Sequence, residues 1–536
     1  MDVRTDDIVK DLQIKVDADH DTVSGRFEWK ATLCQDKAPD QVQREVQQMG
    51  QAVKRQVYGE VLQAVDRQIV AQWQLANAAL QKRGTRAFTF VTPFGVVPIQ
   101  RTRLYNRQDA CWHVPSAVVW HTPQQRCIVE GLREAVCEEM SSLSVRKSAR
   151  HLAEQAGEAQ LLGNSTIVKI VHDEGGQLLE TQRQRAVSVL RRHPEAIETG
   201  LATLPQEEPN ESSPAASVLE KAADQPPADE ERLDELSLAE EQAALQIAVG
   251  FLDEKTSTEQ IPGTEATDQA ASSPGTKHAP RQLEPGWVHC QVDEVKTKAQ
   301  ASSGCKENWT YTATVQLGGR CHYFAEASAE QLWRGVAALL CCLGVRRGGL
   351  QLLVLADGAA WIRKWFEGLK LPGATMILCW FHLAKRVYQD LSGAGFCKAR
   401  REAIQREVLH HLWHGELAGA VWFLWGVREQ ARTPQWITEL IRYLLRRRHY
   451  LPNYAARHEA GLWIASTRVE KWNDWSVADR CKRRGMSWTN HGVLSLASHQ
   501  ANRYNGEMDS WRAGRELPAW EPGEPPQEAS RFALAS

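Results

Sequence analysis

The second half of the chain alternates between strand-like and helix-like apolar patterns. Residues 287–293 have the pattern of a strand that ends in a carboxylate, and apolar and polar positions alternate along 309–317. The unbroken apolar run at 352–356 predicts a central strand that is buried on both faces. The pattern also predicts a third strand at 321–325, helices at 329–343 and 359–368, and a strand at 374–378. We therefore predict a mixed sheet in the order β-β-β-α-β-α-β, with helices after it.

The first half opens with a long helical pattern and a hairpin. Apolar residues recur every three to five positions along 40–82, which predicts either a coiled coil or an amphipathic helix buried on one side. Two extended runs then flank Pro93-Phe94-Gly95, which predicts a β-hairpin with Arg86, Arg101 and Arg103 on one or both faces.

Two shorter helical segments follow and predict a helix-turn-helix. The first helix covers 145–155, the turn lies at 157–164, and the second helix covers 165–172 with Ser165 as its N-cap. A recognition helix of this kind would direct Thr166, Lys169 and His172 at a DNA groove. Packing of two short helices without any DNA contact is the alternative.

The two halves of the chain are separated by a segment whose amino-acid composition differs from both. The chain has 536 residues, which suggests about three domains. Residues 201–280 carry 17 Asp/Glu against 4 Lys/Arg, with eight Pro and a single Phe, so we predict a disordered acidic linker. The rest of the chain is therefore basic, as a polyanion-binding protein requires. The predicted parts are a helix and hairpin (1–120), a helix-turn-helix region (121–195), the linker (196–284), a catalytic domain (285–500) and a tail (501–536).

Composition also limits where the protein works. The chain contains no run of 18 apolar residues, and its first residues lack the pattern of a signal peptide, so no membrane contact is expected. The 12 cysteines are scattered and form no CxxC pair, which favours a reducing compartment over a disulfide framework. We expect a cytoplasmic protein.

Carboxylates stand at two strand ends of the predicted sheet. Asp293 lies at the end of one strand and Asp357 directly follows the central one. If these strands are neighbours, the two acids meet at one edge, where a divalent cation such as Mg²⁺ would offset their repulsion. A third ligand would come from the helical pattern after residue 467, as Glu470 or as Asp474 one turn later. Taken singly, each acid has a structural alternative as a turn residue, a solvated strand end or a helix-start acid.

Several motifs in this half resemble those of a known family. They are Val292-Asp293-Glu294-Val295, the segment from Leu355 through Asp357-Gly358 to Ile362, Pro372-Gly373-Ala374, the Cys379–His382 motif, Arg468-Val469-Glu470-Lys471, and Val477, Arg480, Lys482 and Gly485-Met486-Ser487-Trp488. This set resembles the DDE transposases of bacterial insertion sequences, in the branch related to the plant Mutator elements. The resemblance covers residues 288–511 and extends weakly to Thr92–Gly95 and 111–115.

The resemblance implies a fold, a chemistry and a set of site residues. It implies an RNase H-like core in which Asp293, Asp357 and Glu470 hold two Mg²⁺ or Mn²⁺ ions, with a helical insertion at 383–466. His382 is a further candidate catalytic residue, to contact the scissile phosphate or orient a metal ligand; alternatively, Cys379 and His382 only end a strand. Zinc binding by this pair alone is disfavoured, because two ligands do not fill a tetrahedron. The implied reaction is DNA cleavage and strand transfer by in-line displacement.

A basic, aromatic-rich stretch would hold the DNA. Residues 442–484 contain 11 Lys/Arg against 4 Asp/Glu, with Tyr443, Tyr450, Trp463, Trp472, Trp475 and Trp488 interleaved. A solvated basic face beside core tryptophans is the alternative. The candidate DNA-binding residues are Thr166, Lys169, Arg446, Arg447, Arg448, Arg480, Lys482, Arg483 and Arg484.

The expected partners are the transposon ends and target DNA, with a homo-oligomer, at least a dimer, to bring two ends together. Two other functions remain open at this point. One is a structure-specific nuclease or resolvase of the same fold, and the other is a non-catalytic DNA-binding regulator derived from a transposase.

Overall fold

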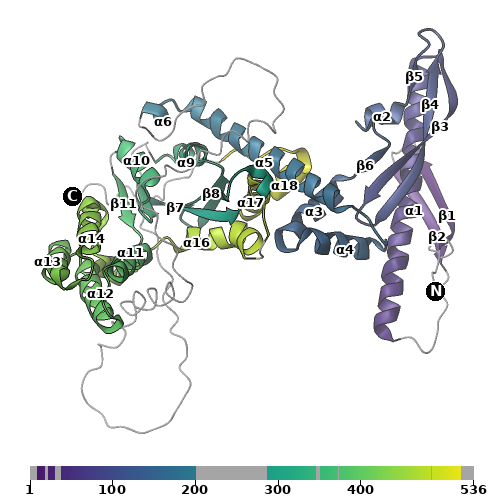
Figure 1. The fold of residues 1–536 in the computed structure, drawn as a ribbon. Coiled ribbons are helices and arrows are strands. Elements are labelled where there is room, and N and C mark those ends of the chain that lie inside the picture. Colours follow the sequence, from purple (N-terminus) through teal and green to yellow (C-terminus); the bar gives the residue numbers. More distant parts are fainter. Residues whose placement is uncertain are drawn as a thin grey trace, which may run out of the picture. The chain divides into compact units, whose positions relative to one another are not determined.

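The computed structural model describes residues 9–17, 22–29, 38–198, 200, 286–345, 350–371, 373–483 and 486–520 (Figure 1). The predicted linker (196–284) lies outside these residues from position 201 onward, and its first residues belong to a short helix, α6 (Glu195–Glu198). The chain divides into two compact units, 1–174 and 175–536, which are described separately below.

The first unit is built around a four-stranded sheet covered by a long helix. The sheet has the order β5-β4-β3-β6 and is mixed, since β3 and β6 are parallel and the other pairs antiparallel. A separate antiparallel pair is formed by β1 and β2. The elements are β1 (Val9–Asp17), β2 (Thr22–Trp29), α1 (Pro39–Ala76), β3 (Leu80–Thr92), β4 (Gly95–Asn106), β5 (Trp112–His113), α2 (Pro115–Val119) and β6 (Arg126–Ile128).

The predicted hairpin is present as β3 and β4. Phe88, Phe90, Val97 and Ile99 form its buried core, and side chains of α1 pack against them. The helix α1 is therefore amphipathic and one-sided, and it ends at Ala76 rather than at the predicted residue 82 because the chain there already pairs as β3. Arg101 is not available on a face of the hairpin: it is 2% exposed, with its guanidinium 3.3 Å from the Phe88 ring centroid.

Three helices complete this part of the chain: α3 (Glu130–Ser142), α4 (Val145–Ala156) and α5 (Asn164–Arg192). The first predicted helix of the helix-turn-helix matches α4, which begins at the N-cap Ser144 and ends at Gly157 with φ +69°. The second is far longer than predicted. Its first helical hydrogen bond runs from the Ile167 amide to the Gly163 carbonyl, so Ser165 lies inside the first turn and is not the N-cap.

The second unit contains a five-stranded mixed sheet with the predicted order of elements. The strands lie in the order β11-β10-β7-β8-β9, in which β11, β10 and β7 are parallel and β8 and β9 antiparallel. The elements are β7 (Trp287–Lys298), a 3₁₀ turn η3 (Ala301–Ser303), β8 (Glu307–Leu317), β9 (Arg320–Glu326), α9 (Ala329–Cys342), β10 (Gln351–Ala356), α10 (Ala360–Gly368) and β11 (Ala374–Leu378).

Each face of this sheet has its own core, because successive strand residues point to opposite sides. On one face, Val288, Cys290 and Val292 of β7 pack in a cluster with α9, α10 and the end of α5. On the other face, Leu353 and Leu355 of β10 pack with the helices that follow β11. The central strand is therefore buried on both sides, as its apolar run predicts.

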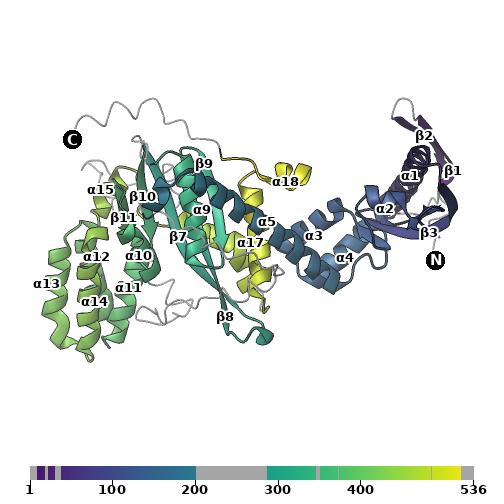
Figure 2. The same ribbon diagram turned by 90° about the horizontal axis from the view of Figure 1, so that it is seen from above.

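All regular elements of the predicted insertion, among the described residues, are helices or 3₁₀ turns. Figures 1 and 2 show its helices α11 to α14 gathered beside β11, the edge strand. Its elements are α11 (Trp380–Gly393), α12 (Lys398–Trp413), α13 (Leu417–Val427), η4 (Arg428–Gln430), α14 (Pro434–Arg446), η5 (Arg448–Tyr450) and α15 (Tyr454–Glu459). After it come α16 (Thr467–Asn473), a π-helical continuation η6 (Asp474–Lys482), α17 (Asn490–Tyr504) and α18 (Met508–Gly514). Gly485, which belongs to one of the motifs that carry the resemblance, lies outside the described residues.

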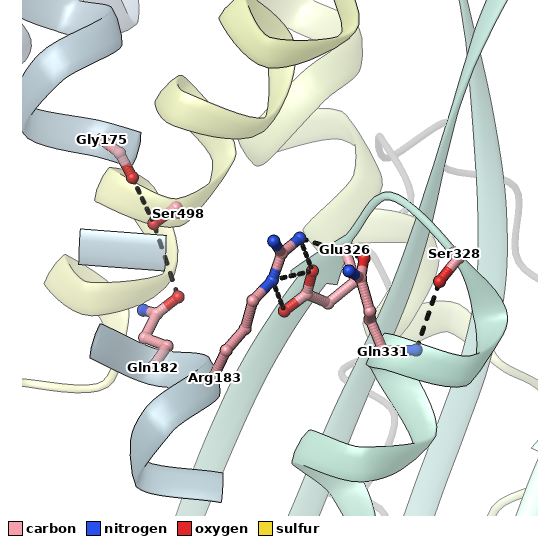
Figure 3. Close-up of polar contacts among 7 residues, drawn as sticks. All are labelled: Gly175, Gln182, Arg183, Glu326, Ser328, Gln331 and Ser498. Atoms are coloured by element: carbon pink, nitrogen blue, oxygen red, sulfur yellow. Dashed lines mark hydrogen bonds and ion pairs between the residues drawn. The ribbon is translucent and has the colours of Figure 1, made fainter. Parts of the chain in front are cut away.

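The second half of α5 belongs to the sheet unit. Figure 3 shows Arg183 of α5 reaching the Glu326 carboxylate at the end of β9 and Gln331 of α9. On the other side of α5, the Ser498 hydroxyl of α17 lies 3.4 Å from both the Gly175 carbonyl and Gln182 Oε1. A Cβ on Gly175 would clash with the Ser495 backbone, so glycine is needed at this helix contact.

The observed units differ from the predicted domains at two places. The boundary falls inside α5 at residues 174 and 175, not at the acidic linker, because Ala186, Val189 and Leu190 contribute to the sheet core. The predicted tail is folded as far as residue 520, with Trp511 and Trp520 buried.

No helix among the described residues combines the length and the apolar character needed to cross a membrane. The α/β-plus-helical fold class is thus confirmed at this level.

Candidate active site

Two parallel strands bring Asp293 and Asp357 to the same level of the sheet. Gln291 of β7 pairs with Leu355 of β10, and two residues further each chain reaches its aspartate. Asp357 directly follows β10, but Asp293 does not end its strand as predicted, because β7 continues to Lys298 by pairing with β8. Neighbouring strands lie roughly 4.8 Å apart, and residues two apart share a face, so both carboxylates project from the face that carries Gln291. Asp357 Oδ1 accepts the Ala359 amide at 2.9 Å, and Gly358 adopts φ +83°, which closes the turn after β10.

The helix α16 brings Glu470 to these two acids. Gln291 Oε1 accepts the backbone N–H groups of Arg468 and Val469 at 3.0 and 3.2 Å. Ser466, the N-cap of α16, makes no side-chain cap hydrogen bond. The side-chain oxygen of Gln291 therefore accepts the N–H groups of the first helical turn that an N-cap side chain would otherwise accept. At the other end of α16, Asn473 Nδ2 donates to Asp293 Oδ2 at 2.7 Å. Glu470 thus lies on a short helix held to β7 at both ends.

A buried threonine orients the asparagine. Thr312 of β8 is opposite Asp293 in the antiparallel register, and its hydroxyl lies 2.5 Å from Asn473 Oδ1. A hydroxyl donor at Oδ1 turns the other side of the amide, the Nδ2 donor, toward the Asp293 carboxylate. Asp293 is therefore held in one orientation by residues from two different elements.

Negative charge is crowded at this edge of the sheet. Burial raises the pKa of Asp293 to about 7, and the Asp357 and Glu470 carboxylates add to the rise while His382 opposes it. Burial also raises the pKa of Glu294 to about 8, with further contributions from Asp357 and Asp293. The Glu294 side chain accepts a hydrogen bond from Trp361 Nε1 of α10. The crowding favours a bound cation, because a cation would stabilise the ionised carboxylates.

His382 is the cationic group that faces these acids. It lies in the first turn of α11, with Nδ1 at 3.7 Å from Glu470 Oε1. Burial by itself lowers the pKa of His382, but Cys379 and the Asp357 and Asp293 carboxylates outweigh it, so the pKa lies well above its usual value. His382 therefore belongs to the same electrostatic cluster as the three acids.

Asp474, the alternative to Glu470, is directed elsewhere. Its Oδ1 lies 2.6 Å from Arg483 Nη2 in an ion pair on the surface of η6. Of the two helix acids, Glu470 is therefore the one next to His382 and Asp293.

The predicted DNA-binding arginines and lysines divide into exposed and buried residues. Arg446, Arg448, Lys482 and Arg483 are exposed, although Arg483 is paired with Asp474 and Asp479. In the first unit, Lys169 is exposed, and Thr166 and His172 are half-buried in α5. Arg484 lies outside the described residues.

Arg447 and Arg480 are interior residues, which corrects their assignment to a DNA surface. Arg447 is 1% exposed, donates to the Gly358 carbonyl at 3.3 Å and lies over the Tyr443 ring. Arg480 is 2% exposed, with its guanidinium 4.7 Å from the Trp488 ring centroid. The planar guanidinium stacks on an aromatic ring in each case, so the arginine–aromatic pattern here is core packing. Of the aromatic residues predicted to stack on bases, Tyr443, Trp472 and Trp488 are also buried, whereas Trp475 is 42% exposed.

Three residues that hold the acids in place were not predicted from the sequence: Gln291, Thr312 and Asn473. The sequence pattern could have indicated two of them. Gln291 precedes Asp293 by two residues and so shares its strand face, and Asn473 follows Glu470 by about one helical turn. The pattern gives no indication of Thr312, because only the β7–β8 register places it opposite Asp293.

The arrangement of three carboxylates and a histidine at one sheet edge suits binding of divalent cations and reaction at an anionic group. No protein family model matches the chain, and no curated protein sequence matches it.

Proposed function

We propose that the protein is a DNA transposase that cleaves and joins DNA strands with an RNase H-like core. The observation that supports this most directly is the attachment of α16 to β7, which holds Glu470 beside Asp293 and Asp357. The strand order, with a parallel β7–β10–β11 half and an antiparallel β8–β9 half, and the helical insertion before Glu470 are consistent with the expected core.

The donor set fits hard divalent cations. Asp293, Asp357 and Glu470 offer carboxylate oxygens, the ligands that Mg²⁺ and Mn²⁺ prefer. When bound, two such ions would activate the attacking oxygen and neutralise charge on the scissile phosphate. The residues of the chain hold these ligands: Gln291 and Asn473 fix α16 and Asp293, and the turn at Gly358 fixes Asp357. His382 presents a positive charge to the phosphate or orients Glu470.

Exposed cations of each unit would hold the DNA. Arg446, Arg448 and Lys482 remain available in the second unit, and Lys169 in the first. Since each phosphate contact releases counterions, binding through these residues would weaken as the salt concentration rises. We propose a homo-oligomer, at least a dimer, because joining an element requires both of its ends.

Purified protein tests this function on DNA fragments that carry the sequences flanking its own gene. With Mg²⁺, we expect strand breaks at the fragment ends and products in which those 3′-hydroxyl ends are joined to a second DNA. Breaks confined to branched DNA, without joining, would favour the nuclease or resolvase. Binding without any break would favour the non-catalytic regulator and overturn the proposal.

Gln291 is a positioning residue in this scheme, and its substitution should weaken use of the metal. Gln291→Leu removes the acceptor for two amides of α16 and lets Glu470 move. Loss of an outer contact to a metal site typically costs 10- to 100-fold, so we expect strand cleavage to fall by about that factor. The Mg²⁺ concentration for half-maximal cleavage should rise with it.

Gln316→Leu is the matched control for this prediction. It removes a largely buried glutamine from the neighbouring strand β8, whose side-chain amide donates to the Gly318 carbonyl at 3.3 Å. Its Mg²⁺ dependence should equal that of the unsubstituted protein. If Gln291→Leu lowers the rate with an unchanged Mg²⁺ dependence, Gln291 is only structural.

A further inference from the structure

Cys379, His382 and Glu470 form a cluster of a different chemical kind beside the acidic pair. Among the residues that the structure describes, it is the group of three potential metal ligands whose donor atoms all lie within 4.8 Å of one another. Cys379 and His382 stand three residues apart at the start of α11, and Glu470 comes from α16. The sequence motif alone offers two ligands, and the fold adds a third.

The distances are close to those of a metal site. Ligand atoms about 2.0–2.3 Å from a tetrahedral zinc ion lie roughly 3.3–3.7 Å from each other. His382 Nδ1 lies 3.7 Å from Glu470 Oε1, so small side-chain movements would bring both atoms to one ion. Cys379 is fully buried, whereas the His382 and Glu470 side chains are 22% and 38% exposed, so an ion could enter from their side.

One residue orients two of the three ligands. The Ser466 amide donates to Cys379 Sγ at 3.4 Å, and the Ser466 hydroxyl donates to Glu470 Oε1 at 3.1 Å. The Cys379 amide donates to the Ala356 carbonyl at 2.7 Å, which ties the cysteine to the end of β10. Cys379 is also the N-cap of α11, where the helix end favours negative charge. Such outer contacts are typical of metal ligands.

We propose that Cys379, His382 and Glu470 bind a divalent transition metal of the Zn²⁺ or Co²⁺ class. A sulfur, nitrogen and oxygen donor set suits these ions, whereas Mg²⁺ disfavours thiolate and imidazole. Three protein ligands leave a fourth position for water. The site would exclude Mg²⁺ and so differ in selectivity from the carboxylates of Asp293 and Asp357.

A regulatory consequence follows, and it rests on the proposed function. Glu470 is shared between the two ligand sets. An ion held by Cys379 and His382 withdraws Glu470 from Asp293 and Asp357, so Zn²⁺ inhibits Mg²⁺-dependent strand cleavage by occupying this neighbouring site.

Titration of the metal-free, full-length protein with Co²⁺ tests the binding site. We expect one equivalent of Co²⁺ to give thiolate-to-metal charge-transfer absorption, together with the visible bands of four-coordinate Co²⁺. Zn²⁺ should abolish both and Mg²⁺ neither. Cys379→Ser should lose the charge-transfer absorption, whereas Cys481→Ser, which removes another buried thiol of the same unit, should keep it. An unsubstituted protein without this absorption, or a Cys379→Ser protein that retains it, overturns the proposal.

A second variant tests the metal site even if the Cys379→Ser protein does not fold. His382→Gln, with its fold verified by circular dichroism, should lower the Co²⁺ affinity about tenfold or more. An unchanged affinity contradicts the site. Asp357→Asn removes a carboxylate outside this ligand set and should keep the full absorption, so the spectrum reports on the site even if the protein cleaves no DNA.

The inhibition has its own readout. In strand-cleavage assays at fixed Mg²⁺, each protein is compared with its own zinc-free rate, and Zn²⁺ should inhibit the Cys379→Ser protein about tenfold less than the unsubstituted one. Equal inhibition of both overturns the regulatory consequence. Absence of cleavage in every protein overturns the proposed function, while the Co²⁺ spectrum still decides the metal site.

Discussion

Asp357→Asn is expected to abolish Mg²⁺-dependent strand cleavage while leaving the fold intact. The substitution keeps the oxygen that accepts the Ala359 amide, so the turn after β10 is retained. It removes one negative charge from the metal site, and metal ions provide several kcal/mol of charge stabilisation in such reactions. Since about 1.4 kcal/mol corresponds to tenfold in rate, cleavage should fall by about 10³-fold or more. Gel analysis of end-labelled DNA measures the rate, and thermal unfolding followed by circular dichroism verifies the fold.

The matched control for this variant is Asp509→Asn, which removes an aspartate of the same unit whose side chain is 98% exposed. Its cleavage rate should stay within about twofold of the unsubstituted protein, as expected for a surface residue away from such a site. If Asp357→Asn cleaves DNA within tenfold of the unsubstituted rate, its carboxylate is not needed for the reaction. The proposal of a three-carboxylate active site would then fail.

Arg183→Met should produce the largest loss of stability, because it leaves a carboxylate buried without its cation. Arg183 donates to Glu326 Oε2 from Nε at 3.1 Å and from Nη2 at 2.7 Å, and to Gln331 Oε1 at 3.0 Å (Figure 3). The two charged side chains are only 19% and 10% exposed. Removing one partner of a buried ion pair typically costs about 3–5 kcal/mol. Urea unfolding of the full chain followed by circular dichroism should show a loss of this size in the transition of the sheet unit.

Replacing both partners distinguishes the loss of stability caused by an unpaired buried charge from the net contribution of the ion pair to stability. Arg183→Met with Glu326→Leu leaves no buried charge, and such double replacements are often nearly neutral, so most of the stability should return. Arg512→Met is the control, because its partner Asp509 is solvent-exposed and surface pairs contribute about 1 kcal/mol or less. The expectation fails if Arg183→Met is no less stable than Arg512→Met, or if the double variant is no more stable than the single one.

The helices and strands of the sheet unit could be predicted because their patterns are local. The apolar run of β10 and the alternation of β8 depend on residues close together in the chain, and the structure has both strands where they were expected. The second helix of the predicted helix-turn-helix was placed at 165–172, whereas α5 continues without a break to Arg192. The residues near position 172 do not indicate how far the helix extends. Its later residues are helical on account of their packing against α9 and β9, which lie more than a hundred residues away in the chain.

The basic stretch at 442–484 shows where composition misleads. Arg447 and Arg446 are neighbours of the same chemical type, yet one is buried on Tyr443 and the other is exposed. Helix rotation separates consecutive residues by about 100°, so a run of arginines always faces more than one way. Counting charges therefore predicted a basic region correctly but could not assign each residue to the surface.

The sequence by itself determined the order of the elements, the position of Asp357 directly after β10 and the presence of a later acid on a helix. These follow from local periodicity and from the rule that parallel strands end at one edge. Only the tertiary structure decided that Glu470 rather than Asp474 faces the pair, that Gln291 caps its helix, and that Cys379 and His382 gain Glu470 as a neighbour. Each of these contacts joins segments 80 to 180 residues apart in the chain, and such pairings depend on packing and strand register, which no short stretch of sequence encodes.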